Sequence, residues 1–155
     1  MSVLFVCLGN ICRSPAAQAV FARKVKEDGL SFVCRIESCA LGDWNNGLSP
    51  DSRMIESAKK RGYLLDSIAK GFQPQFFKEF DYILAVDQKV ANELKSRTTD
   101  PAYSSKIKLI TAFSDKYLGR DIPDPFYSDP AAFDLVLDII EESLDGLIAA
   151  LKVLV

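Results

Sequence analysis

The chain has 155 residues, 48% hydrophobic and 26% charged, proportions typical of a single globular domain spanning 1–155. Its 19 basic and 21 acidic side chains give a formal net charge of −2, and we expect no nucleic-acid partner because binding through phosphate contacts usually requires a basic excess. The sequence has no histidine, which excludes Ser-His-Asp and Cys-His catalysis and every metal site with a histidine ligand.

Apolar runs alternate with amphipathic segments, the pattern of an α/β fold. In chain order we predict a strand at Ser2–Cys7, a helix at 15–28, a strand at Phe32–Ser38, a helix from Asp51 to about Arg61, a short helix near Pro74–Glu79, a strand at Asp81–Val86, a helix after Asp87 to about Arg97, a short strand at Ile107–Leu109 and a long helix from Pro130. Ser14 followed by Pro15 predicts the N-cap and first position of the first helix. Segments 98–106 and 121–129 are predicted to be loops.

The last helix carries one apolar stripe, which we interpret as core packing. Its members are Phe133, Val136, Ile140, Leu144, Leu147, Leu151 and Leu154. The four strands and their helices predict a small doubly wound, four-stranded, mainly parallel sheet with helices on both faces. Ligands of such sheets bind at the carboxyl ends of the strands, near a topological switch point. We therefore expect a phosphate loop directly after the first strand.

The four cysteines, at positions 7, 12, 34 and 39, are spaced unlike a zinc ligand set. The N-terminus lacks the features of a secretion signal, and no window approaches the 18 apolar residues of a membrane span. We expect a soluble cytoplasmic protein with reduced thiols and no membrane partner.

The turn after the first strand is the strongest functional signal in the sequence. It reads Cys7, Leu8, Gly9, Asn10, Ile11, Cys12, Arg13, Ser14. Backbone N–H groups of such a loop converge at the positive end of the next helix and form an anion cradle. Arg13 adds a planar fork that holds two phosphate oxygens. The same positive field favours the thiolate form of Cys7, and Ser14 can donate a hydrogen bond to its sulfur. A thiolate placed below a phosphoryl group is a nucleophile that needs no histidine base.

A phosphoryl-transfer site also needs an acid for the leaving oxygen. The segment 121–127 offers Asp121 and Asp124, and Asp124 is the better candidate because prolines on both sides stiffen its presentation. Phe126 and Tyr127 follow it and could form walls around a phenyl ring. Trp44 is a similar loop aromatic, and its position is equally consistent with a pocket wall and with a lid over the core.

The segments VLFVCLGNICRSP and DPFY, together with GDWNNG, SPDSRMIESAKKRG and FDYILAVD, closely resemble the low-molecular-weight protein tyrosine phosphatases. The resemblance covers nearly the whole chain. It implies that Cys7 forms a cysteinyl-phosphate, that Arg13 and the loop residues bind the phosphoryl oxygens, and that Asp124 is the acid and then the base. It implies phosphotyrosine proteins as substrates. We expect no metal or other cofactor, because Arg13 and the loop N–H groups carry the charge stabilisation that a metal would otherwise provide, and we expect a monomer.

The resemblance assigns further roles around this site. Asn10 and Ser14 would hold the loop, and Trp44, Phe126 and Tyr127 would line the substrate pocket. Ser38 and Asp87 would support the site from behind, and Cys12 would be the second loop cysteine, able to form a protective disulfide with Cys7.

Two departures from the family pattern stand out. Where many relatives have His-x-Ala-Arg, this chain reads Ser67, Ile68, Ala69, Lys70, Gly71, so we expect Asn10 either to lose a hydrogen-bond partner or to use Ser67. At position 126 this chain has phenylalanine where family members often have tyrosine. One possible regulatory phosphorylation site is therefore absent, and Tyr127 remains.

Three other functions use the same loop. An arsenate reductase would need two further redox cysteines after the third strand, and 81–95 contains none, while Cys34 and Cys39 lie in or beside the second strand. Relatives that are protein arginine phosphatases resemble the same loop pattern, but with threonine at the position where this chain has Ile11. A non-enzymatic anion-binding module would leave Cys7 inert and would have no use for Asp124.

Overall fold

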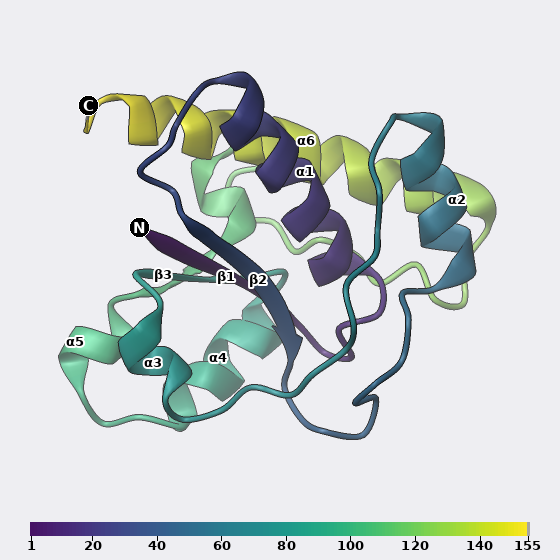
Figure 1. Ribbon diagram of the computed structural model, residues 1–155. Helices are drawn as coiled ribbons and strands as arrows, with labels where there is room; N and C mark the ends of the chain where they lie inside the picture. The colour runs from purple at the N-terminus through teal and green to yellow at the C-terminus, as the bar shows by residue number, and fades with distance from the viewer. Residues whose placement is uncertain (155) are drawn as a thin grey trace.

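The computed structural model describes residues 1–154 and contains four strands and a set of helices in alternation (Figure 1). In chain order these are β1 Ser2–Cys7, α1 Arg13–Glu27, β2 Arg35–Ala40, α2 Ser52–Lys60, α3 Phe76–Glu79, β3 Tyr82–Ala85, α4 Gln88–Ser96, α5 Pro101–Ser104, β4 Ile107–Leu109, the 3-10 helix η1 Ile110–Phe113 and α6 Pro130–Lys152.

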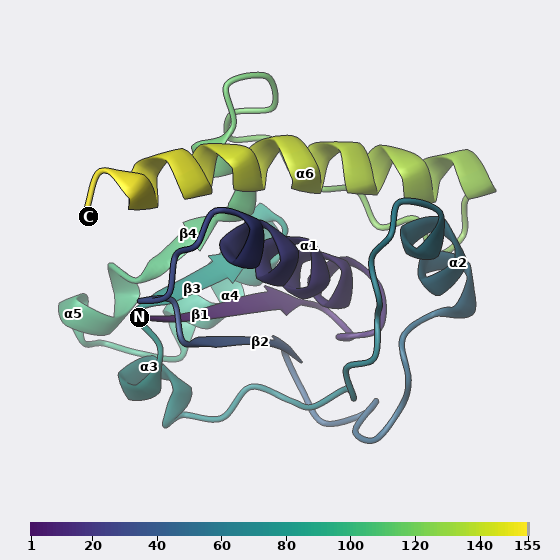
Figure 2. The ribbon, with the colours of Figure 1, turned by 45° about the horizontal axis from the view of Figure 1, so that its top comes forward.

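The strands form one parallel sheet in the order β2-β1-β3-β4, as expected (Figure 2). From β1 the chain moves to β2 on one side of the sheet and then returns to place β3 on the other side. The switch point therefore lies between the carboxyl ends of β1 and β3, where Cys7 ends β1. Parallel sheets of this kind bind ligands in the crevice that such a reversal creates.

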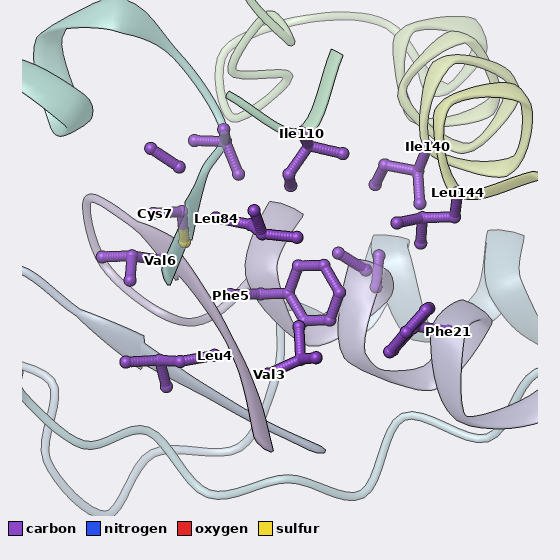
Figure 3. Packing of buried hydrophobic residues seen from close by; sticks show 14 of the residues in the cluster. Val3, Leu4, Phe5, Val6, Cys7, Phe21, Leu84, Ile110, Ile140 and Leu144 are labelled. Carbon is purple, nitrogen blue, oxygen red and sulfur yellow. The ribbon is translucent and has the colours of Figure 1, made fainter. Parts of the chain in front are cut away.

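Helices cover both faces of this sheet, with α1 and α6 above the strands in Figure 1 and α4 below. Side chains of β1 alternate between the two faces. Figure 3 shows Val3 and Phe5 on the side of Phe21 and α6, and Leu4 and Val6 on the other side. The rings of Phe5 and Phe21 meet edge to face, with centroids 5.6 Å apart. Because β1 is buried on both faces, it is a rigid support for the loop that follows it.

The predicted N-cap of the first helix is wrong. The helix begins at Arg13, the cap position is Cys12, and no side chain caps this end of α1. Ser14 instead lies in the first turn with its hydroxyl bonded inside the loop. The uncapped N–H groups are those that a bound anion would satisfy, which explains why the ordinary capping rule fails here.

Other differences concern element boundaries. β2 starts at Arg35 rather than Phe32, because residues 30–33 form a turn before the chain can pair with β1. Within the predicted loop 98–106, Asp100 caps the short helix α5. Leu154, placed in the apolar stripe from its spacing, is 63% exposed because α6 ends at Lys152.

Within residues 1–154, no helix is both long enough and apolar enough to cross a membrane. The same part of the chain has no group of three or more cysteine, aspartate and glutamate side chains placed to hold a metal ion.

Candidate active site

Residues 7–14 wrap into a tight loop between β1 and α1. Asn10 has a φ of +55°, a left-handed conformation that asparagine tolerates better than most residues. A Cβ at Gly9 would lie 2.8 Å from the Asn45 amide nitrogen and would displace this group, which donates to the Gly9 carbonyl at 3.0 Å. The loop is thus held from outside by the segment after β2.

The buried side chain of Asn10 fixes the loop from inside. Its amide nitrogen donates to Ser14 Oγ at 2.8 Å and to Ser38 Oγ at 2.9 Å, and Ser38 in turn donates to Gln18 Oε1 at 2.6 Å. The Asn10 Oδ1 accepts from the backbone N–H of Lys70 at 3.1 Å. The alternatives expected for Asn10, a lost partner or Ser67, are both wrong, because a main-chain N–H of the same segment takes this place.

The sulfur of Cys7 lies at the centre of the loop. It accepts a hydrogen bond from the backbone N–H of Asn10 at 3.2 Å and lies 2.9 Å from Ser14 Oγ. Because Ser14 Oγ already accepts the Asn10 amide, its own proton is free to point at the sulfur. The Asn10 N–H and the Ser14 hydroxyl therefore both face Cys7 Sγ.

Arg13 is buried and lines the same pocket as Cys7, and its orientation is set from two directions. Its Nη1 donates to Asp87 Oδ2 and to the Ile122 carbonyl, both at 2.8 Å. Asp87 also caps α4, because its Oδ1 accepts from Val90 N at 2.9 Å. The guanidinium is therefore held as a rigid fork at the edge of the loop.

The two candidate carboxylates, Asp121 and Asp124, have different surroundings. Asp124 lines the pocket, and its Oδ2 lies 3.8 Å from Arg13 Nη2, with the side chain half exposed. Asp121 accepts from the backbone N–H of Gln88, the first residue of α4, at 2.9 Å, and it does not line the pocket. The geometry accordingly favours Asp124 over Asp121 as the acid.

A pocket of about 370 Å³ opens above the loop. Its lining consists of Cys7, Leu8, Gly9, Ile11, Cys12, Arg13, Trp44, Asn45, Asp124, Phe126 and Tyr127. Trp44 is 61% exposed and belongs to the pocket wall rather than to a lid over the core. The rings of Phe126 and Tyr127 meet edge to face at 4.9 Å. Aromatic walls above an anion cradle suit a ligand that joins a flat ring to a phosphate.

Arg53 is a structural contributor that sequence reasoning missed. Its guanidinium pairs with Asp51 at 2.8 Å and donates to the Phe126 carbonyl at 2.8 Å. The backbone N–H of Asp51 donates to the Ile11 carbonyl at 2.6 Å. Asp51 and Arg53 thus tie the phosphate loop to the segment that carries Asp124. The only sequence signal was the SPDSR segment, which reads first as a helix cap.

The second loop cysteine differs from the first in its surroundings. Burial, together with the negative charge of Cys7, raises the pKa of the Cys12 thiol well above its usual range. All four cysteines are free thiols in this structure. Cys12 is therefore a protonated neighbour of the central sulfur.

A parallel α/β sheet whose first strand ends in a Cys-x5-Arg loop, with an aspartate at the rim, defines the class of cysteine-dependent phosphatases. Residues 2–154 match the family described as low molecular weight phosphotyrosine protein phosphatase. The low molecular weight phosphotyrosine protein phosphatase of Sus scrofa is 38% identical over 136 residues, covering 87% of this chain and 85% of that protein. The chain belongs to the low molecular weight phosphotyrosine protein phosphatase family.

Solved structures agree with this assignment. A protein tyrosine phosphatase from Entamoeba histolytica superposes with a TM-score of 0.92 at 38% identity, covering 98% of this chain and 97% of that one. A Drosophila arginine phosphatase superposes with a TM-score of 0.89 at 30% identity, covering 98% of each chain. The fold is shared by both specificities, so the fold alone does not distinguish them.

Proposed function

We propose that the chain hydrolyses phosphotyrosine in proteins and that Cys7 is the nucleophile. The observation that carries this proposal is the convergence of Asn10 N–H and Ser14 Oγ on Cys7 Sγ at the floor of an anion pocket. The thiolate attacks phosphorus, the bond to the tyrosyl oxygen breaks, and a cysteinyl-phosphate forms.

Charge on the transferring phosphoryl group is stabilised by the loop and by Arg13. Backbone N–H groups of Leu8, Gly9, Ile11 and Cys12 and the free end of α1 supply hydrogen bonds to the equatorial oxygens. Asn10 and Ser14 hold the loop in shape. Arg13 adds the positive fork, so the chain's own residues provide the stabilisation for which other phosphoryl-transfer enzymes use a metal ion.

Asp124 is the proposed acid and base. In its protonated form it gives a proton to the departing tyrosyl oxygen, and as a carboxylate it then takes a proton from the water that attacks the cysteinyl-phosphate. Phosphate leaves and Cys7 returns as thiolate. Its position at the rim of the pocket, 3.8 Å from Arg13 Nη2, supports this proposed role. Trp44, Phe126 and Tyr127 would grip the phenyl ring.

We further propose that the chain acts as a single-domain, monomeric cytoplasmic enzyme without nucleic-acid or membrane partners. Its net charge of −2 and its lack of a basic excess support the absence of nucleic-acid partners.

The first experiment is hydrolysis of p-nitrophenyl phosphate from pH 5 to 8 with a chelator present, for the wild type and for Cys7→Ser. Activity in the wild type and none in the variant supports the cysteinyl-phosphate route. If both proteins are inactive while phosphate still binds, the loop is an anion site and the catalytic proposal fails. Vanadate should compete with the substrate, since it mimics the trigonal bipyramidal transition state.

Phosphoarginine is the second candidate substrate because of the likeness to the Drosophila arginine phosphatase. Ile11 lines the pocket at the position where the arginine-specific pattern has threonine. We expect phosphotyrosine to be hydrolysed with the higher kcat/KM. A higher value for phosphoarginine would reverse this order and leave the role of Cys7 unchanged.

A further inference from the structure

A second hollow, of about 580 Å³, opens beside the phosphate pocket. The two hollows share Leu8, Arg13, Trp44 and Asp124 as lining residues. The shared side chains form the boundary between the hollows. A substrate whose phosphate is seated on the loop can therefore extend across this boundary into the second hollow without leaving the protein surface.

One part of the second hollow is apolar. Leu41 and Val90 line it together with Leu8 and Trp44, and the last two are large side chains that are 50% and 61% exposed. Exposed apolar groups clustered beside a polar site are typical of a surface that receives a partner's side chain. The methylene groups of a substrate residue next to the phosphotyrosine would pack here.

The other part is charged, where Lys89 and Glu93 of α4 and Arg97 at its C-cap follow one another at intervals of four residues. Glu93 is already paired, since its Oε1 lies 3.1 Å from Arg97 Nε. Among the ion pairs of residues 1–154, none includes Lys89, which is exposed. Lys89 is the second residue of α4, two positions after the Asp87 that binds Arg13.

The remaining carboxylates of the hollow are also engaged. Asp87 binds Arg13 at 2.8 Å, and Asp124 faces the same guanidinium at 3.8 Å. Lys89 is therefore the one cation of this lining that no carboxylate within residues 1–154 neutralises. A hollow with apolar walls and an unpaired ammonium at its edge matches a side chain with an apolar stem and a carboxylate end.

We propose that the second hollow is a specificity subsite for a glutamate that flanks the phosphotyrosine in the substrate protein, with its carboxylate on Lys89. This inference rests on the proposed function, because it assumes that the phosphate occupies the loop of residues 7–14.

The test uses phosphotyrosine peptides that carry a single glutamate at successive flanking positions, each paired with the glutamine peptide of the same shape. We expect one position at which the wild type prefers glutamate by about two- to fivefold in kcat/KM at low salt, the range of an exposed ion pair. The preference should shrink when salt shortens the Debye length to about 3 Å at 1 M. A ratio taken within each protein cancels any general change in activity.

Three variants should change the glutamate preference in different ways. Lys89→Glu should abolish or reverse the glutamate preference, and Glu93→Gln should increase it, because it removes a negative charge from the hollow. The control is Lys95→Glu, which makes the same change in net charge on the same helix. Lys95 is exposed and lines a different hollow, with Thr98 and Pro101, so the preference should stay at the wild-type value.

The outcomes separate this inference from the proposed function. The subsite proposal is overturned if phosphotyrosine peptides are hydrolysed with no glutamate preference, or if the preference survives in Lys89→Glu. It is also overturned if Lys95→Glu removes the preference equally, because that result would indicate a general charge effect. If the wild type hydrolyses neither p-nitrophenyl phosphate nor any phosphotyrosine peptide, the proposed function itself fails.

Discussion

Replacing Asn10 removes three hydrogen bonds, one within the phosphate loop and two that hold the loop to the rest of the protein. The bonds join its side chain to Ser14, Ser38 and Lys70 at 2.8, 2.9 and 3.1 Å, in a site where Asn10 is 1% exposed. A net contribution of about 1 kcal/mol for each bond gives a loss of about 3 kcal/mol in the free energy of unfolding. Alanine, which unlike asparagine and glycine does not readily adopt the φ of +55°, should lose about 1 kcal/mol more.

We therefore expect Asn10→Gly to be destabilised by about 3 kcal/mol and Asn10→Ala by about 4 kcal/mol. Urea unfolding at pH 7 measures both values, and Ser38→Ala should reproduce only part of the loss, because it removes one partner. The reasoning is refuted if either Asn10 variant lies within about 1 kcal/mol of the wild type, or if glycine costs more than alanine. Either result would mean that the loop does not depend on this network.

Three further predictions concern the acid, a buried tyrosine and the thiols. Asp124→Ala should reduce turnover far more for phenyl phosphate than for p-nitrophenyl phosphate, because an acidic phenol needs less protonation as it leaves; equal losses in steady-state assays would argue against an acid role. Tyr63 donates to Glu141 at 2.9 Å, and burial together with this bond raises the pKa of Tyr63 to about 12. Since the unfolded chain releases this proton near pH 10, the stability it provides is complete below pH 10 and is lost as the pH rises toward 12; Tyr63→Phe should lack that part of the pH dependence in urea unfolding. Because burial raises the pKa of Cys12 and Cys34 is exposed, iodoacetamide at pH 7.5 should modify Cys34 much faster than Cys12; comparable rates by peptide mass spectrometry would contradict this assignment.

The sequence alone was sufficient to predict the class of fold and the position of the phosphate loop. Both depend on short-range patterns. An apolar β-branched run followed by a turn and a helix predicts a buried strand that leads into a helix N-terminus, and the alternation of such units predicts a parallel sheet. The eight residues from Cys7 to Ser14 are contiguous, so their chemistry can be predicted without knowing the rest of the structure. The family resemblance is confirmed, because residues 2–154 match that family.

Only the tertiary structure decided which distant groups complete the site. The flanking prolines favoured Asp124 over Asp121, but only the folded loop shows that Asp124 lines the pocket while Asp121 accepts from the backbone N–H of Gln88. The side-chain oxygen of Asn10 accepts a hydrogen bond from the backbone N–H of Lys70, sixty residues away in the sequence. A main-chain donor carries no side-chain signature in the sequence. Such contacts follow from strand order and from how the chain returns to the switch point. For Ser14 the sequence predicted both a helix cap and a hydrogen bond to the sulfur of Cys7, and the folded loop shows the contact with the sulfur and not the cap.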